Sequence, residues 1–215
     1  MRLGYRFAPV LVIALLAAAC SGNPEPEPVP PPPPPPPPPA AVDDGSRREA
    51  AADRICERAM TAMQSGDYTT ARELLEQVVR DYPGTTCADS APAEIERAMA
   101  GEAIVARVHF DYNVADITDE AAGTLQRKAD ALRAYPDIRL RIEGHCDERG
   151  SLEYNQALGL RRAQAAMEYL GSLGIDAGRL DVVTFGEERP LTTGSNESAW
   201  RQNRRGEFVV TDGDI

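Results

Sequence analysis

Lysine is almost absent from this sequence. Lys128 is the only lysine among 215 residues, and arginine supplies the remaining basic side chains. Asp and Glu number 34 against 23 Lys and Arg, so the formal net charge is −11 at pH 7. Because such an acidic chain repels other polyanions, the composition argues against a nucleic-acid-binding protein and against charge-driven binding to an anionic membrane surface.

Motifs of common enzyme classes are missing as well. The chain contains no serine elbow, no phosphate-binding loop and no dinucleotide fingerprint. The adjacent His145 and Cys146 suggest a base and a nucleophile, but neighbours on an extended chain point to opposite sides. A zinc site needs three or four converging ligands, and His109 is the only other histidine. We therefore expect no enzyme, no metal and no cofactor, and we interpret Cys146 as a packing residue.

The apolar run near the N-terminus is too short to cross a bilayer. It covers residues 7–19, follows Arg2 and Arg6, and ends in three alanines. These features are typical of a secretory signal, which we assign to residues 1–19. The sequence LAAAC up to Cys20 resembles a lipobox, so we expect lipidation of Cys20 and membrane anchoring through its acyl chains.

Two details bear on this lipidation hypothesis. A lipobox usually has leucine three residues before the cysteine, where this chain has Ala17, with Leu16 one place further away. An ordinary cleavage site that leaves a free Cys20 is the alternative. The residue after the cysteine is Ser21 and not an aspartate, which by resemblance to bacterial sorting rules favours the outer membrane.

Proline dominates the next segment. Single prolines alternate with other residues from Pro24, and residues 30–39 are unbroken proline. Such a chain has a fixed φ and few donors, so it adopts extended polyproline II and packs no core. At about 3.1 Å per residue, Pro24–Pro39 would span on the order of 50 Å. We predict that residues 20–45 are a lipidated N-terminus and a disordered Pro-rich spacer; a ligand for proline-recognition modules is the alternative.

Residues 46–100 carry helical periodicity. Apolar residues at three- and four-residue spacing predict two helices around a turn at residues 66–68, and a third helix from about Ala91 to Ala100. The pattern resembles one tetratricopeptide-type helical hairpin. A single repeat cannot bury both of its faces, so it should pack on the main domain, on a partner or on another copy. A plain helical spacer is the alternative.

Cys56 and Cys87 both lie in this helical segment. An exported protein meets an oxidising compartment, and the chain after the second helix of a hairpin returns alongside the first. We therefore expect Cys56 and Cys87 to form a disulfide, which would stabilise the fold by roughly 3–4 kcal/mol in the chain-entropy model.

From about residue 103 the pattern alternates between strands and helices. Period-two apolar residues predict strands over Ile104–Phe110 and Ile138–Glu143. We predict a third strand over Leu180–Phe185 and a fourth over Arg205–Val210. Helical stripes lie between them, the first beginning after the candidate N-cap Thr118. The order βαβαβαβ predicts that residues 103–215 form an α+β sandwich, in which helices cover one face of a small sheet.

The stretch 144–170 joins the second strand to the second long helix of this domain. Asp147 lies on the loop, and the spacing places Asn155, Leu158 and Arg162 on one face of the helix. A carboxylate and a guanidinium that face one crevice suit a zwitterionic ligand, because the acid binds an ammonium and the arginine binds a carboxylate bidentately.

These residues resemble the OmpA-like peptidoglycan-binding domain family. The family's Gly-x-x-Asp motif is matched by Gly144 and Asp147, and its helical Asn, Leu and Arg-Ala pattern by Asn155, Leu158, Arg162 and Ala163. Further matches are Phe110 and Asp111 at the end of the first strand, and Asn203, Arg204 and Arg205 before the last strand. The run DERG at residues 147–150 is closer to the family's peptidoglycan-associated lipoproteins than to OmpA itself.

The resemblance implies a site for the diaminopimelate of a peptidoglycan stem peptide. Asp147 would hold the ammonium group and Arg162 the carboxylate. Asn155 and Leu158 would line the same wall, and the neighbouring loops would add Phe110, Asp111 and Arg204. We expect Asp147→Ala or Arg162→Ala to leave folding intact and to weaken peptidoglycan binding.

The function implied by the resemblance is that of an outer-membrane lipoprotein facing the periplasm. It would tether the outer membrane non-covalently to the cell wall and serve envelope integrity and division. Tol-system proteins such as TolB, which bind this domain elsewhere in the family, are the implied partners. The alternative is an envelope adaptor whose helical segment recruits a protein partner, with the wall contact only as a tether.

Overall fold

The computed structural model describes residues 44–215. The expected signal segment, Cys20 and the Pro-rich spacer lie outside these described residues. Within residues 44–215, the helices are too short or too polar to cross a membrane.

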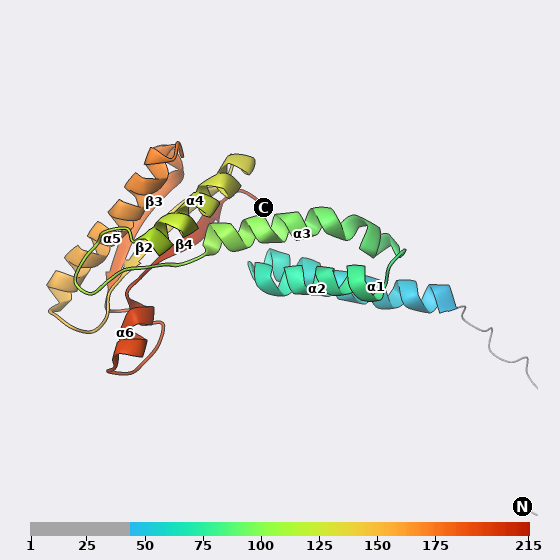
Figure 1. The fold of residues 1–215 in the computed structure, drawn as a ribbon, viewed down its shortest axis with the longest axis horizontal. Coiled ribbons are helices and arrows are strands. Elements are labelled where there is room, and N and C mark those ends of the chain that lie inside the picture. The colour runs from blue at the N-terminus through green and yellow to red at the C-terminus, as the bar shows by residue number, and fades with distance from the viewer. Residues whose placement is uncertain (1–43) are drawn as a thin grey trace, which may run out of the picture. The chain divides into compact units, whose positions relative to one another are not determined.

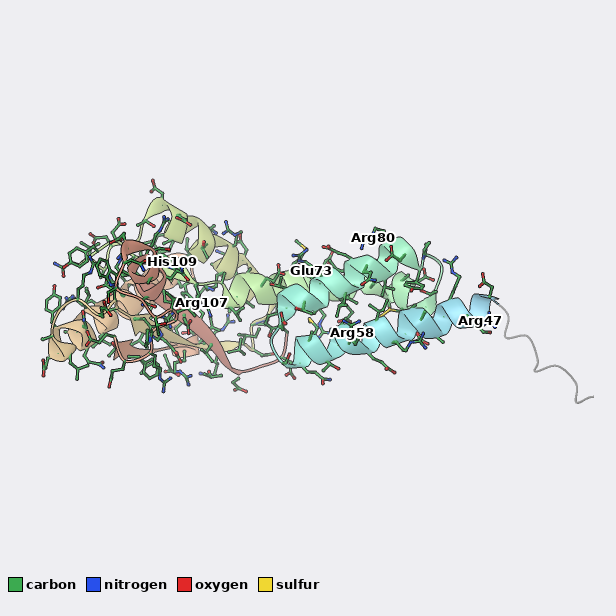
Figure 2. All side chains as sticks on the ribbon, turned by 90° about the horizontal axis from the view of Figure 1, so that it is seen from below. Arg47, Arg58, Glu73, Arg80, Arg107 and His109 are labelled. Atoms are coloured by element: carbon green, nitrogen blue, oxygen red, sulfur yellow. A yellow bond between two sulfur atoms is a disulfide. The ribbon has the colours of Figure 1, made fainter. Side chains whose placement is uncertain are left out.

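Three helices make up the first part of the described chain: α1 (Asp44–Gln64), α2 (Tyr68–Asp81) and α3 (Thr86–Val105) (Figure 1). Asp67 begins α2 by accepting a hydrogen bond from the backbone N–H of Thr70 at 3.1 Å. Small and apolar side chains fill the space between the helices: Ala52, Ala59, Leu75, Val78 and Ala91. Charged side chains take the outer surface, as Figure 2 shows for Arg47, Arg58, Glu73 and Arg80.

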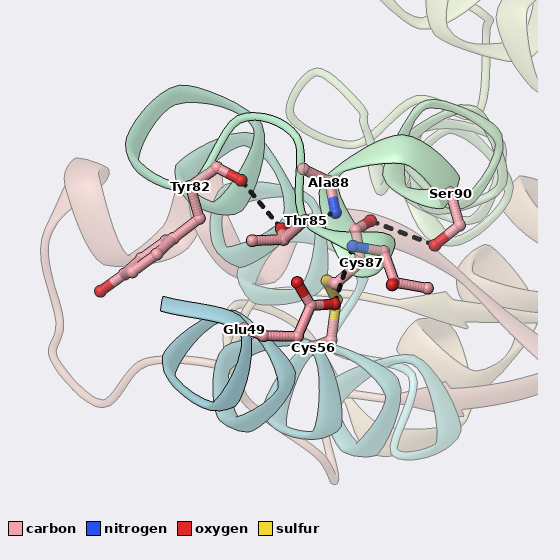
Figure 3. Close-up of a disulfide and its surroundings, with 8 residues drawn as sticks. Glu49, Cys56, Tyr82, Thr85, Cys87, Ala88 and Ser90 are labelled. Atoms are coloured by element: carbon pink, nitrogen blue, oxygen red, sulfur yellow. Dashed lines mark hydrogen bonds between the residues drawn. A yellow bond between two sulfur atoms is a disulfide. The ribbon is translucent and has the colours of Figure 1, made fainter. Parts of the chain in front are cut away.

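A disulfide joins Cys56 of α1 to Cys87 at the start of α3, with 6.4 Å between the two Cα atoms (Figure 3). Beside it, a Glu49 carboxylate oxygen accepts a hydrogen bond from the backbone N–H of Thr86 at 2.9 Å. Thr85 caps α3 by accepting a hydrogen bond from the N–H of Ala88 at 3.3 Å. The first turn of α3 is therefore attached to α1 by both covalent and polar contacts.

The structure differs from the sequence prediction at the end of the third helix. The sequence predicts that this helix ends near Ala100 and that a strand covers Ile104–Phe110. In the structure, α3 continues to Val105 and the strand β1 covers only Val108–His109. Ile104 packs from α3 into the main hydrophobic core. Lys128 donates hydrogen bonds to the backbone carbonyls of Ala103 and Ala106, at 3.0 and 3.1 Å, and to that of Ile104. These contacts hold the end of α3 in a helical conformation, and α3 crosses the expected boundary between the helical segment and the C-terminal domain.

The C-terminal domain is an α+β sandwich with the predicted order of elements. Its sheet contains β1, β2 (Arg139–His145), β3 (Leu180–Gly186) and β4 (Arg205–Asp212) in the spatial order β1-β4-β2-β3. β2 pairs with β3 in parallel, and β4 pairs antiparallel with both β1 and β2. The helices are α4 (Asp119–Ala134), α5 (Leu152–Ser172), a short 3₁₀ helix (Ala177–Arg179) and α6 (Glu197–Asn203).

One face of the sheet carries the core. Leu140 and Ile142 of β2 and Phe208 of β4 pack with Leu132 of α4 and Leu170 of α5. Figure 1 shows α4 and α5 on the same side of the sheet. Because side chains alternate along a strand, the opposite face receives a set of charged and polar residues, which are Arg141, Glu143, His145, Arg205 and Glu207.

The backbones of β2 and α5 approach each other closely at two glycines. A Cβ on Gly144 would overlap the carbonyl oxygen of Gly159, and a Cβ on Gly159 would overlap the hydroxyl of Thr184. Only glycine fits on either side of this contact. The close approach directs the first turns of α5 toward the loop that follows β2, where the candidate site lies.

Candidate functional site

A small cavity lies where the loops after β1 and β2 meet the start of α5. Its volume is about 10 Å³, so it is closed to anything larger than a water molecule. The structure brings four of the sequence-predicted residues together in its lining: Asp147, Asn155, Leu158 and Arg162. The rest of the lining comes from Tyr112, Asn113, Cys146, Arg149 and Tyr154.

Asp147 is buried and already paired with two arginines. Arg149 donates to both of its carboxylate oxygens, at 3.0 Å from Nε and 2.7 Å from Nη2. Nη1 of Arg204 donates to Oδ2 at 3.2 Å. Burial alone would raise the pKa of Asp147, but the hydrogen bonds from Arg149 and Arg204 outweigh it and lower the pKa below its usual value. The acid is therefore ionised and oriented at neutral pH.

Arg162 differs from its predicted role. Its side chain is almost fully buried and donates to three backbone carbonyls, those of Val114 at 2.9 Å, His145 at 2.8 Å and Asp111 at 2.9 Å. These carbonyls belong to the loop after β1 and to the end of β2. Arg162 thus fixes both sides of the cavity. Arg162→Ala would leave these carbonyls without their donor, so the expectation that this variant folds normally loses its structural basis.

Asn155 organises the loop that carries Asp147. Its amide donates to the carbonyl of Asp147 at 3.2 Å and to that of Arg149 at 3.3 Å, and also contacts the carboxylate of Glu187. Leu158 lies one turn further along α5 and forms the apolar part of the cavity wall. Both residues come from the helical face that the sequence spacing predicted.

The remaining predicted residues, Phe110, Asp111 and Arg204, contact residues of the cavity wall and do not line the cavity themselves. Phe110 is a core residue, and its ring lies 5.3 Å from the Arg162 guanidinium. Arg204 donates to the carbonyl of Phe110 at 3.1 Å and to Glu197 at 2.8 Å. Asp111 contacts Arg162 through its backbone carbonyl, while its side chain is exposed. None of these three residues lines the cavity in the described structure.

Arg149 is the functional candidate that sequence reasoning missed. Its guanidinium lies between two aromatic rings, 4.0 Å from the centroid of Tyr112 and 4.0 Å from that of Trp200. Trp200 in turn donates from its indole N–H to Glu148 at 3.1 Å. Stacking and the two bonds to Asp147 hold Arg149 over the mouth of the cavity. The only signal in the sequence was its place in the run DERG.

His145 and Cys146 have separate surroundings. The Cys146 thiol donates to the carbonyl of Asn155 at 3.3 Å, and burial raises its pKa. The His145 ring faces Glu143 and Glu207 on the other side of β2. Burial, followed by the charge of Arg205, lowers the pKa of His145 to about 4. The two side chains therefore do not form a base–nucleophile pair.

Comparisons with known proteins point to one family. Residues 109–204 match the OmpA family. The chain is similar to the peptidoglycan-associated lipoprotein of Agrobacterium fabrum, with 43% identity over 104 residues that cover 48% of this chain and 59% of that protein. It is also similar to that of Haemophilus influenzae, with 46% identity over 98 residues that cover 46% of this chain and 64% of that protein.

A solved structure is similar over the same share of the chain. It is the crystal structure of the peptidoglycan-associated lipoprotein from Burkholderia pseudomallei, with 37% identity and a TM-score of 0.48, and the match covers 49% of this chain and 89% of that one. The chain spans less than two thirds of the length of the curated relatives named above.

Proposed function

Because residues 109–204 match the OmpA family, we propose that this chain is a cell-envelope protein whose C-terminal domain binds peptidoglycan without a covalent bond. The observation that carries the proposal is the convergence of an ionised carboxylate, Asp147, with the guanidinium groups of Arg149 and Arg162 on one cavity. Such a site suits the zwitterionic end of diaminopimelate, which offers an ammonium and a carboxylate on one carbon.

The contacts in the cavity suggest which residues would bind the ammonium and which would bind the carboxylate of the ligand. The ammonium would replace Arg149 at Asp147. Arg162 has most of its N–H groups committed to backbone carbonyls, so it has little capacity left for a ligand carboxylate. Arg149 is partly exposed and would become free on ligand entry. We therefore assign the carboxylate to Arg149 first, with Arg162 holding the loops and contributing its remaining donor.

The proposal includes an anchor in the outer membrane through a lipidated Cys20, with the binding domain facing the periplasm. A stiff proline spacer between the two would set the distance from the membrane to the wall. A tether of this kind suits a role in envelope integrity and division, with Tol-system proteins such as TolB as partners of the same domain. The chain acts as a binding protein and not as an enzyme in this proposal.

The test is co-sedimentation of the purified full chain with purified peptidoglycan, with free diaminopimelate as competitor. Asp147→Asn keeps the size of the side chain and removes the charge, and we expect it to weaken binding at least tenfold, since a charge-assisted contact contributes about 1.5–3 kcal/mol. The matched control is Glu168→Gln, which removes an exposed acid from α5. Binding that is unchanged in Asp147→Asn, or that free diaminopimelate does not reduce, contradicts the proposal.

A cleft next to the helical segment favours an adaptor role as a second candidate. It has a volume of about 650 Å³ and lies between the α1–α2 turn and β4, with Met60, Tyr68 and Val209 in its lining. A photoreactive side chain at Met60 should crosslink to an envelope protein in cells, whereas one at the exposed Arg133 should not. Equal products from both positions would leave the helical segment as a spacer.

A further inference from the structure

We propose that Glu143, His145 and Glu207 form a zinc-binding site on the face of the sheet that the helices leave uncovered. The two glutamates and the histidine lie on adjacent strands, β2 and β4, with Glu143 paired directly to Glu207. Nε2 of His145 is 3.8 Å from Oε2 of Glu143 and 4.0 Å from Oε2 of Glu207. All three donor atoms lie within 4.8 Å of one another. This site is separate from the Asp147 cavity and does not depend on the proposed function.

The histidine supplies the first reason for a bound ion. His145 is 1% exposed, and both of its ring nitrogens are buried without a hydrogen-bond partner. Within residues 44–215, no other buried side-chain nitrogen or oxygen is left in this condition. Buried polar atoms are nearly always satisfied, so an unpartnered imidazole aimed at two carboxylates indicates a missing ligand.

The carboxylates supply the second reason. Each glutamate uses one oxygen for arginine and turns the other toward His145. Oε1 of Glu143 accepts from Arg141 at 2.7 Å, and Oε1 of Glu207 accepts from Arg107 and Arg205 at 2.7 and 2.9 Å. Metal-binding carboxylates are commonly oriented by such outer hydrogen bonds, which leave the second oxygen for the ion.

The chemical types of the three donor atoms indicate which metal ion would bind. One imidazole nitrogen and two carboxylate oxygens suit Zn²⁺, with water in the fourth position. Zinc bonds of about 2.0–2.2 Å in tetrahedral geometry place the donor atoms roughly 3.3–3.6 Å apart. The 3.8 and 4.0 Å separations between His145 and the two glutamates would therefore shorten by roughly 0.2–0.7 Å on binding, and the two carboxylates would turn toward the ion. Glu207 is partly exposed and leaves a path for the ion. The surrounding guanidinium groups repel a dication, so we expect weaker binding than closed structural zinc sites achieve.

Binding of an ion here would also restrain the Asp147 cavity, because the two sites are connected through the backbone at the end of β2. The carbonyl of His145 accepts the 2.8 Å hydrogen bond from Arg162, and the Asp147 loop begins two residues further on. A zinc ion that ties His145 to Glu207 of β4 would fix the end of β2 relative to the last strand. Sequence reasoning excluded a metal because it counted histidines and did not pair Glu143 with Glu207, which are 64 positions apart.

The test is calorimetric titration of the chelator-treated full chain with Zn²⁺ alone. We expect one ion per chain and at least about tenfold weaker binding in Glu207→Gln, which keeps an oxygen for the arginines but weakens the ligand. Asp181→Asn, which removes an exposed acid from β3, should bind as the original chain does. No binding by the original chain, or equal binding by Glu207→Gln, overturns the proposal.

A second measurement tests whether the ion binds at these three residues or at a cysteine. Co²⁺ bound at Glu143, His145 and Glu207 should give visible d–d absorption without a sulfur-to-metal charge-transfer band, because no cysteine is a ligand. A charge-transfer band that persists in Glu207→Gln would place the ion on a cysteine and overturn the assignment. At one Zn²⁺ concentration, the melting temperature of the original chain should also rise by more than that of Glu207→Gln, whatever the stability of that variant without metal.

Discussion

Arg149 donates to both carboxylate oxygens of Asp147, two residues earlier in the chain, and thereby closes the cavity in which a ligand would bind. The pair satisfies each charge in the absence of a ligand. The pair also places the Arg149 guanidinium beside the position that a ligand carboxylate would take. This guanidinium becomes available once the ammonium group of the ligand has replaced it on Asp147.

Replacing Arg149 tests this arrangement. We expect Arg149→Ala to weaken binding to peptidoglycan about tenfold, because the loss of a charge-assisted contact to the ligand exceeds the gain from freeing Asp147. Arg149→Lys should recover part of the loss, since it keeps the charge but not the planar fork. Binding isotherms from co-sedimentation measure both. Tighter binding by Arg149→Ala would mean that Arg149 only blocks the site.

The contact between Gly144 and Gly159 gives a second prediction. Gly159→Ala forces a methyl group against the Thr184 hydroxyl and the backbone of Gly144, so α5 must move away from β2. We expect a loss of at least about 3 kcal/mol in the free energy of unfolding, together with loss of peptidoglycan binding.

Gly171 is the matched control for this change, because it lies in the same helix and a Cβ added there would meet nothing within 4 Å. Gly171→Ala should be neutral or stabilising by up to about 1 kcal/mol. Denaturant unfolding of the two variants measures the difference. Similar stabilities for Gly159→Ala and Gly171→Ala would contradict the close-approach argument.

Much of the fold was predictable because its elements are locally consistent. The strands β2, β3 and β4 lie where the sequence predicts them, and α5 has the expected stripe of Asn155, Leu158 and Arg162. The end of α3 was not predictable in this way. Ile104 and Val105 alternate with their neighbours as a strand would, and their helical conformation depends on Lys128, which comes from a different helix more than 20 residues later.

Which residues form the site was easier to predict than the role of each residue in it. Helical spacing and motif context located Asp147 and Arg162 near each other. Which arginine pairs with Asp147 depends on Arg204, 57 residues away, and on a stacking arrangement built from Tyr112 and Trp200. Local sequence carries no information on these contacts, so the roles of Arg149 and Arg162 emerge only when the loops are folded.

The disulfide gives a third prediction. Cys56 and Cys87 are separated by 31 residues, so their bond removes roughly 3–4 kcal/mol of chain entropy from the unfolded state. A Cys56→Ser, Cys87→Ser double variant should lose about this amount. Reduction should destabilise the original chain and leave the double variant unchanged. Equal sensitivity of both proteins to reductant would show that this disulfide contributes little.

The buried His145 predicts a dependence of stability on pH. Its pKa is lowered from 6.5 to about 4 in the folded chain, chiefly by burial. Between pH 6.5 and 4 the unfolded chain therefore binds a proton that the folded chain does not. The stability contributed by this neutral histidine is complete above pH 6.5 and falls by roughly 3 kcal/mol as the pH drops through this window.

Denaturant unfolding at several pH values, with chelator present, measures this effect. His145→Gln should show a shallower loss of stability between pH 6.5 and 4, and His109→Gln serves as the control that removes the other histidine. Below pH 4, protonation of Asp147 and Glu207 should destabilise both variants further, because the folded structure lowers the pKa of these two acids. Parallel stability curves for the original chain and His145→Gln would contradict the prediction.

Lys128 gives the last prediction, in which two effects oppose each other. Burial lowers the pKa of Lys128 well below its usual value, so the charged form is costly. Against this, the ammonium donates to the carbonyls of Ala103, Ile104 and Ala106 and lies 3.8 Å from the centroid of the Phe208 ring. The carbonyls form the negative end of the α3 dipole, which favours a cation at this position.

We expect the hydrogen bonds to outweigh the cost of burial, because removal of the amine leaves three carbonyls without a donor at once. Lys128→Met keeps the length of the side chain and should lower the free energy of unfolding by about 1–3 kcal/mol. It should also speed hydrogen exchange at the end of α3, where the helical segment continues into the domain. Gln126→Met, which alters an exposed and uncharged position of the same helix, should change neither quantity. A Lys128→Met variant as stable as the original chain would mean that the desolvation of the ammonium cancels its hydrogen bonds. The connection between α3 and α4 would then rest on the apolar packing of the end of α3, which includes Ile104, Ala103 and Val105.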